Sequence, residues 1–273
     1  MMLMVQLSGG VTQQKGVGAS GGGRGQAKRG PLPGAGERRS MSYKPILFNT
    51  EMVKAIKDGW KTQTRRIAKQ LCGLDPREDG LPPEKFEFFI SPRSGALHWE
   101  DLLRSVTVDG NRVFAPVMPG DILWVREKWQ HVYNFDDGDQ LIEGTGRYVY
   151  YADNPMTFDY WVDPDTGEHK EQMPWKPSIH MPKEAARIFL RVKDVRVERL
   201  QDITETQALM EGCYMYRTKC EIQPGHSGTA IEDFHRVWDS TIKRSELEKY
   251  GWNENPWVWV IEFERCEKPA DFR

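Results

Sequence analysis

The sequence is poor in the features that mark several large classes of protein. Its 273 residues include no apolar run approaching the roughly 20 residues that a membrane-spanning helix needs. It also has no collagen-like or heptad repeat. Lys and Arg number 38 against 40 Asp and Glu, so positive charge is not in excess. We therefore predict a protein that does not span a membrane, form a rod or wrap DNA.

Cysteines and cofactor motifs are also scarce. The four cysteines include no C-x-x-C pair, and no histidine stands at zinc-ligand spacing from them. Residues 1–7 are apolar but too short and uncharged for a signal peptide, so we expect a cytoplasmic protein with reduced thiols. No glycine-rich nucleotide loop, H-E-x-x-H or G-x-S-x-G motif occurs. We expect no metal and no cofactor.

Aromatic residues are missing from residues 1–40, which hold 11 of the 25 glycines. This stretch has six basic and one acidic side chains, so it carries +5 and the remainder carries −7 of the total of −2. Such a composition buries too little apolar surface to fold. We predict a disordered basic leader over 1–41, either foreign to the natural protein or a nucleic-acid tail. After this leader we predict a single domain over 42–268 and a tail over 269–273.

Apolar periodicity in 42–268 predicts several strands and a few short helices. Strands are expected at 44–48, 122–127 and 256–264. A change of phase in the apolar positions of 188–197 predicts a bulge or turn near Lys193. A helix capped by Asn49 or Thr50 is expected after the first strand, and capping boxes begin further helices at Thr204 and Thr229. The fold class is α+β, built on a small barrel or curled sheet with short flanking helices.

The segment Gly59-Trp60-Lys61-Thr62-Gln63-Thr64-Arg65-Arg66 is the most informative for chemistry. Lys61 and Thr64 stand three residues apart on a turn or starting strand. A lysine with a lowered pKa can take the proton of a threonine hydroxyl, and burial together with Arg65 and Arg66 would lower that pKa. A solvated basic turn without function is the alternative.

Glu211 ends a predicted helix just before Gly212. The negative end of the helix dipole disfavours a carboxylate there, by roughly 0.3–1 kcal/mol. We therefore expect a raised pKa if this helix end faces a cleft, and a carboxyl group of that kind suits a general acid. A surface glutamate without a role is the alternative interpretation.

Several tryptophans lie near cations in the sequence, as single-stranded nucleic-acid sites require. These are Trp60, Trp124, Trp129 and Trp175, close to Lys61, Arg126, Lys128 and Lys176. Core packing is the alternative for each ring. His180 lies in a rigid loop flanked by prolines and is the histidine that we expect to border a site, with a structural role as its alternative.

Taken together, three blocks resemble the ASCH domain family of the PUA-like superfamily. They are the turn around Lys61, the run Pro119-Gly120-Asp121-Ile122-Leu123-Trp124-Val125-Arg126-Glu127, and Met210-Glu211-Gly212. Further blocks around Trp175 and Trp257 are similar to the larger ASCH-like proteins of phages and prophages. The resemblance implies a small mixed β-barrel, here with insertions at about 67–116 and 131–174, and a cleft that binds RNA or a modified nucleobase.

Some bacterial members of that family are amidohydrolases that remove the acetyl group of N4-acetylcytidine. By resemblance, Thr64 would be the nucleophile, Lys61 its base and Glu211 the acid for the leaving amine. The resemblance and the residues together give this ligand-binding set: Trp60, Arg65, Arg66, Trp124, Arg126, Glu127 and His180.

We therefore expect a protein that recognises a nucleobase, modified nucleoside or RNA, and we leave open whether it also hydrolyses an amide. A noncatalytic module for RNA or single-stranded nucleic acid is one alternative. Another is a phage morphogenesis or host-interaction protein that contacts a phage or host partner through the acidic segment 131–173. The charge of −7 disfavours tight binding of a long polymer and favours a small ligand. The oligomeric state is open.

Overall fold

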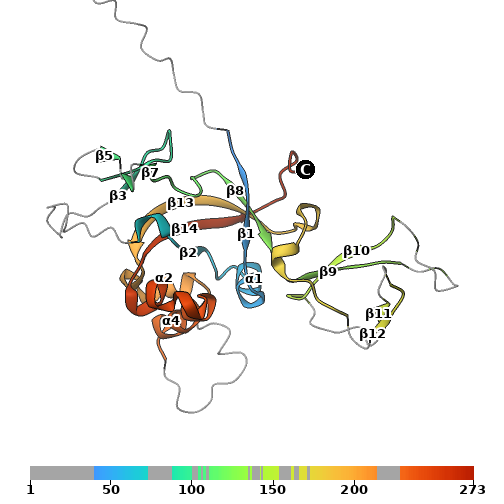
Figure 1. The fold of residues 1–273 in the computed structure, drawn as a ribbon. Coiled ribbons are helices and arrows are strands. Elements are labelled where there is room, and N and C mark those ends of the chain that lie inside the picture. Colours follow the sequence, from blue (N-terminus) through green and yellow to red (C-terminus); the bar gives the residue numbers. More distant parts are fainter. Residues whose placement is uncertain are drawn as a thin grey trace, which may run out of the picture. The chain divides into compact units, whose positions relative to one another are not determined.

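The structure of the protein is a computed structural model. It describes residues 40–72, 88–99, 104–105, 107–108, 111–134, 136, 142, 144–153, 161–162, 166–170, 173–213 and 228–273. The predicted leader lies almost entirely outside these residues, as do parts of both predicted insertions. The chain from Arg39 to Arg273 forms one compact unit, whose elements are labelled in Figure 1.

A mixed five-stranded sheet forms the centre of this unit (Figure 1). Its strands, in spatial order, are β1 (Tyr43–Leu47), β8 (Ile122–Arg126), β13 (Phe189–Arg199), β14 (Trp257–Cys266) and β2 (Gln63–Ile67). β1 and β8 are parallel, and all other neighbours are antiparallel. The predicted α+β class is confirmed. No ladder of hydrogen bonds between the edge strands β1 and β2 closes the sheet within the described residues.

Short strands and helices complete the described part of the chain. The remaining strands are β3 (Phe88–Ile90), β4 (Leu97–Trp99), β5 (Arg104–Ser105), β6 (Thr107–Val108), β7 (Asn111–Arg112), β9 (Trp129–Val132), β10 (Arg147–Tyr150), β11 (Trp161–Val162) and β12 (His169–Lys170). The α-helices are α1 (Thr50–Lys57), α2 (Glu205–Met210), α4 (Ala230–Thr241) and α5 (Leu247–Tyr250). None of these helices combines the length and the apolar character that crossing a membrane requires.

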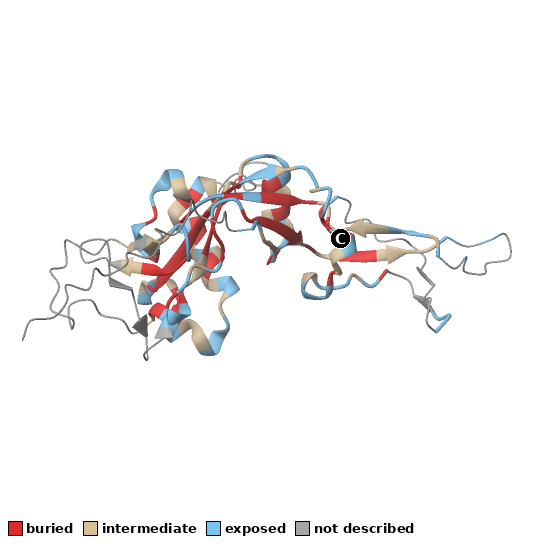
Figure 2. Ribbon diagram, turned by 90° about the horizontal axis from the view of Figure 1, so that it is seen from above, coloured by how far each residue is buried: buried red, intermediate tan, exposed pale blue. Residues whose placement is uncertain are grey.

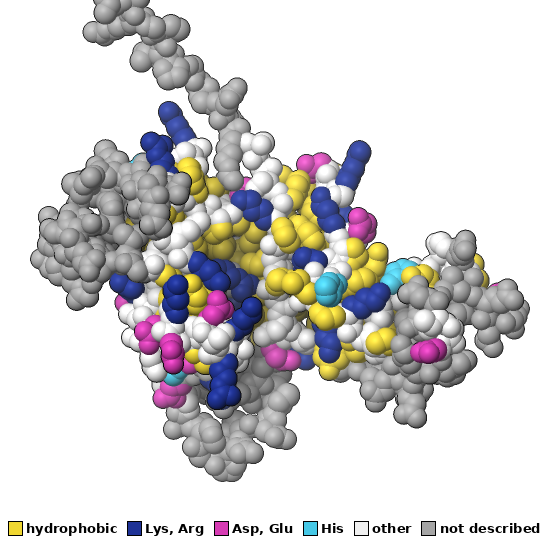
Figure 3. All heavy atoms as spheres, in the orientation of Figure 1, with side chains coloured by type: hydrophobic (Ala, Val, Ile, Leu, Met, Phe, Trp, Pro, Cys, Tyr) yellow, Lys and Arg dark blue, Asp and Glu magenta, His cyan; other side chains and the backbone are white. Residues whose placement is uncertain are grey.

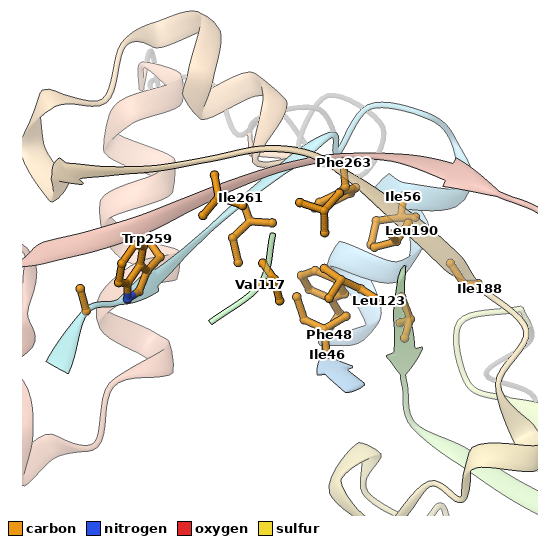
Figure 4. Close-up of a cluster of buried hydrophobic side chains, with 14 of the residues drawn as sticks. Ile46, Phe48, Ile56, Val117, Leu123, Ile188, Leu190, Trp259, Ile261 and Phe263 are labelled. Carbon is orange, nitrogen blue, oxygen red and sulfur yellow. The ribbon is translucent and has the colours of Figure 1, made fainter. Parts of the chain in front are cut away.

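β14 is buried on both faces, which explains its uninterrupted run of apolar residues (Figure 2). Trp257, Trp259, Ile261 and Phe263 point to one face, as the alternation of a strand requires, and they belong to the same core cluster as Val53 and Ile56 of α1. Figure 4 shows Phe263 near Ile56 and Trp259 farther along the sheet. Val258 and Val260 point to the other face and pack with the apolar sides of α2 and α4. Each fully buried side chain of this size contributes about 1.5–3 kcal/mol.

The predicted bulge is present in β13. Val192 pairs with Phe263 and Asp194 pairs with Glu262, so Lys193 is the extra residue. After the bulge, every second side chain of β13 is charged and lies on the face opposite the α1 core. Of the charged side chains on this face, Glu198 reaches Arg65 of β2.

The two edge strands of the sheet come close to each other at one point. Nη2 of Arg66 in β2 donates a hydrogen bond of 2.8 Å to the carbonyl oxygen of Leu47 at the end of β1. The guanidinium group also lies over the ring of Phe48, with 5.3 Å between Cζ and the ring centroid. The sheet is therefore curled, and a side chain rather than a ladder spans the gap between its edges.

Candidate functional site

Lys61 lies just after the C-terminal end of α1. The side chain of Asn49 accepts a 2.9 Å hydrogen bond from the amide of Met52 and caps the helix, as the sequence predicts. Gly59 has a φ of +80°, a conformation that favours glycine, and turns the chain out of the helix. The amides of Trp60 and Lys61 both donate to the carbonyl of Ala55, so the position of Lys61 is fixed by the last turn of α1.

Glu211 lies at the C-terminal end of α2. Thr204 and Gln207 form the predicted capping box at the start of this helix, and Glu211 is its C-terminal cap. Gly212 follows with a φ of +85°, and a Cβ atom there would lie 2.9 Å from Cβ of Ala55. This close approach seats the end of α2 against the end of α1, with Glu211 facing Lys61.

Lys61 and Glu211 form a buried ion pair. Their side chains are 0% and 3% exposed, and Nζ lies 2.8 Å from Oε2. Nζ also donates to the carbonyl oxygens of Glu211 and Gln63, each at 2.8 Å, so all three donors of the ammonium are used. Burial lowers the pKa of Lys61, and the charge of Glu211 opposes that shift. The predicted direction is therefore present.

Arg65 holds the second oxygen of the same carboxylate. Its Nη1 lies 3.2 Å from Oε1 of Glu211, and its Nη2 binds Glu198 at 3.0 Å and the side chain of Gln207 at 3.1 Å. The two arginines thus have different roles from those we expected. Arg66 is the arginine whose charge lowers the pKa of Lys61, whereas Arg65 is neutralised by carboxylates.

A pocket of about 200 Å³ opens beside this cluster. Thr64 and Arg66 lie on one face of the edge strand β2, and Arg65 and Ile67 lie on the other. All four line the pocket, together with Glu211, so the pocket reaches around the edge of the sheet. Its remaining wall comes from α1, α4 and the residue after α4: Met52, Phe234, Val237, Trp238, Thr241 and Ile242.

Thr64 enters this pocket without a bond to Lys61. The side-chain nitrogen of Lys61 donates to Glu211 and Gln63 instead, and no hydrogen bond joins the Thr64 hydroxyl to another of the described residues. Lys61, Thr64 and Glu211 are therefore gathered at one place, but the hydrogen bond between base and nucleophile is absent from this arrangement.

The other predicted ligand-binding residues form a second group that does not line the pocket. Trp124 packs in a core cluster with Phe272, which lies in the stretch we expected to be a tail. Arg126 donates to the carbonyl oxygens of Met181, at 3.0 Å, and Ile179. His180 is exposed in the same loop, and Trp60 is half-buried on the turn before Lys61.

Glu127 belongs to a structural ion pair. Its carboxylate is 1% exposed and receives two hydrogen bonds of 2.9 Å from the guanidinium of Arg187. Arg187 also binds Asp153, which in turn binds Lys57 at the end of α1. These contacts tie the segment after β8 to α1, and they leave both carboxylate oxygens of Glu127 engaged within the protein.

Comparison of the chain with protein-family models, curated proteins and solved structures gave no match. The resemblance to the ASCH family therefore depends on the sequence blocks that carry it, and the site has to be interpreted from its own chemistry. Within the described ranges, no group of three or more His, Cys, Asp or Glu side chains is arranged to hold a metal ion.

Trp129 packs as a core residue. It is 6% exposed and forms a cluster with Met181 and Ala185. Nζ of Lys176 lies over the ring, 5.3 Å from its centroid, so the charge of that lysine is placed against the face of the ring. The pairing of a tryptophan with a cation, noted in the sequence, is thus used here for packing.

Two parts of the site were missed by sequence reasoning. Phe234 and Trp238 were predicted as a core stripe of a helix, and they also form the apolar wall of the pocket. Glu198 and Gln207 hold Arg65, yet nothing in the sequence places either of them beside β2. The order of the strands in the sheet is the information that would have found Glu198.

Proposed function

We propose that this protein is an ASCH-like, PUA-like domain that recognises a nucleobase or modified nucleoside in the pocket beside β2. The observation that carries the proposal is the buried pair of Lys61 and Glu211, placed next to a pocket that Thr64 and Glu211 both line. These are the three positions that the family resemblance singles out. The curled sheet is compatible with the proposed barrel.

The size and walls of the pocket support a small, flat ligand. Pockets for drug-sized molecules usually have volumes of about 300–1,000 Å³, and this one has about 200 Å³. The lining includes the aromatic side chains of Phe234 and Trp238, together with a hydroxyl, two guanidinium groups and a carboxylate. Aromatic side chains close to a few polar groups suit the flat face and the hydrogen-bonding edge of a single base.

The same residues suit hydrolysis of an N-acyl group, as the second part of the proposal. A proton that moves from Nζ of Lys61 to Oε2 of Glu211 gives a neutral amine and a carboxylic acid, which are the base and acid that the reaction needs. Burial lowers the pKa of Lys61 and thereby favours its neutral amine.

In the proposed reaction, Oγ of Thr64 attacks the acyl carbon and its proton passes to Lys61. The C–N bond then breaks, and Glu211 gives its proton to the leaving amine. Water next attacks the acyl-threonine ester, which releases the carboxylic acid and restores the hydroxyl. For the first step, the lone pair of the neutral Lys61 amine must turn toward Thr64 and accept a hydrogen bond from its hydroxyl.

Recognition without hydrolysis is the second candidate, and a specific observation favours it. All three donors of Lys61 and both oxygens of Glu211 are engaged within the protein. A network that is satisfied in this way forms a rigid polar wall and does not need to exchange protons.

The test is incubation of the full chain with N4-acetylcytidine and related N-acylated nucleosides, with chromatographic detection of free cytidine. Thr64→Val and Glu211→Gln are compared with Thr241→Val, which changes a threonine on another wall of the same pocket. We expect turnover in the wild type and in Thr241→Val, and a loss of at least about 100-fold in the other two.

Circular dichroism shows whether each variant is folded. Nucleoside binding without turnover in the wild type would leave recognition standing and remove the hydrolase. Absence of both binding and turnover, in a folded wild-type protein, would reject the proposed function.

A further inference from the structure

Arg66 differs from the other cations of the site in having no acidic partner. Lys61 is paired with Glu211, and Arg65 is paired with Glu211 and Glu198. Among the described residues, no carboxylate lies within ion-pair distance of the Arg66 guanidinium. Within the described part of the chain, its one hydrogen bond goes from Nη2 to the carbonyl of Leu47, which uses one of its five N–H donors.

The surroundings of Arg66 make this charge a costly one to leave unpaired. The side chain is half-buried and lies against the face of Phe48. Burial lowers the pKa of the guanidinium, and the charge of Glu211 only partly offsets that effect. A cation that is partly withdrawn from water is stabilised by an opposite charge, so an anionic ligand would supply the partner that the described residues do not.

The charge of the pocket points in the same direction. Its charged lining consists of Arg65, Arg66 and Glu211, which leaves one positive charge in excess. Residues 41–273 together carry a net charge of −7. Figure 3 shows basic side chains gathered beside apolar surface on one face of the molecule. A local positive site in an acidic protein attracts a small anion but not a long polyanion.

We infer that Arg66 forms a phosphate subsite, and that the ligand of this pocket is a nucleotide rather than a neutral nucleoside. The identity of the base rests on the proposed function, whereas the anion site does not. Thr64, Arg66 and the aromatic side chains of α4 line the same pocket. In this arrangement the phosphate lies against Arg66 and the base lies against the aromatic side chains of α4.

The first test uses inorganic phosphate, which needs no base. Thermal unfolding of the full chain is followed in phosphate and in chloride at equal ionic strength, for the wild type, Arg66→Met and Arg191→Met. Arg191 is exposed and does not line the pocket, so its variant matches the loss of charge. We expect phosphate to raise the unfolding temperature of the wild type and Arg191→Met but not of Arg66→Met. No increase in the wild type, or an equal increase in Arg66→Met, overturns the subsite.

The second test compares cytidine with cytidine 5′-monophosphate by calorimetry. We expect the monophosphate to bind the wild type about tenfold more tightly or better, because hydrogen bonds to a charged group have that strength. In Arg66→Met the two ligands should bind alike. Equal binding to the wild type would refute the nucleotide assignment and leave nucleoside recognition intact.

The two proposals fail in different ways. Binding of inorganic phosphate through Arg66, without binding of either cytidine ligand, would reject the base and keep the anion subsite. The comparison of the two ligands in the wild type needs no variant, so the inference stays testable if Arg66→Met does not fold. Arg66→Lys, which keeps the charge, should keep part of the preference for phosphate.

Discussion

Replacing Glu211 with Gln removes the one negative charge that two buried cations share. The side chains of Lys61 and Arg65 are 0% exposed, and Glu211 is 3% exposed. Arg65 keeps Glu198 as a charged partner after the change, whereas Lys61 keeps neutral oxygen acceptors and loses the carboxylate with which it pairs. Removing one partner of a buried pair costs about 3–5 kcal/mol. We expect a loss in this range, which is a large part of a typical stability of about 5–15 kcal/mol.

The measurement is urea unfolding of the full chain, followed by circular dichroism and compared at equal slope. Glu264→Gln is the matched control, because Glu264 pairs with Lys193 at 3.1 Å while both side chains are more than half exposed. A pair of that kind contributes less than about 1 kcal/mol. If Glu211→Gln cost no more than Glu264→Gln, the reasoning from burial would be wrong. Adding Lys61→Met to Glu211→Gln should recover part of the loss, because the unpaired charge is removed.

Three further predictions concern the same region. Burial lowers the pKa of Lys61 below its usual 10.5, so between the folded-state pKa and 10.5 the unfolded chain binds more protons than the folded chain. Over this pH range the unfolding free energy of the wild type should therefore rise with pH relative to that of Lys61→Met. A difference that stays flat or falls would contradict this. Gly212→Ala adds a Cβ atom 2.9 Å from a neighbour and should cost about 2–5 kcal/mol in urea unfolding, against about 1–2 kcal/mol for Gly59→Ala, where φ is also positive but nothing is near. Arg187→Met should cost about 3–5 kcal/mol, since it leaves the carboxylate of Glu127 buried and unpaired; a loss below about 1 kcal/mol in the same assay would contradict the structural role of that pair.

Local features of the fold were predictable from the sequence. The side chains of Asn49 and Thr204 cap their helices by accepting hydrogen bonds from the amides three residues ahead, and such bonds depend only on neighbours in the chain. The bulge at Lys193 follows from a change of phase within one strand. The strand predicted at 256–264 from its apolar residues is also present, as β14, which is buried on both faces.

The site itself was predictable only in part. Lys61 and Glu211 were identified because each follows a helix whose end the sequence marks with a glycine, and those two helix ends meet. Which residues surround them depends on the order of the strands. Trp124 and Arg126 belong to a strand on the far side of β13 and β14 from β2, so a family motif grouped residues that do not line one pocket. Glu198 reaches Arg65 only because β13 lies two strands from β2.

The chain of ion pairs around the site limits how the sequence can change. Glu211, Arg65, Glu198 and Arg196 alternate in sign, and each contacts the next. A single replacement therefore removes one ionic partner from each neighbour in this chain, whereas a coordinated pair of replacements can keep the charges matched. Accepted changes should arise in pairs, and the coupling energy between Arg65 and Glu198 in a double-mutant cycle measures how strongly the two positions constrain each other.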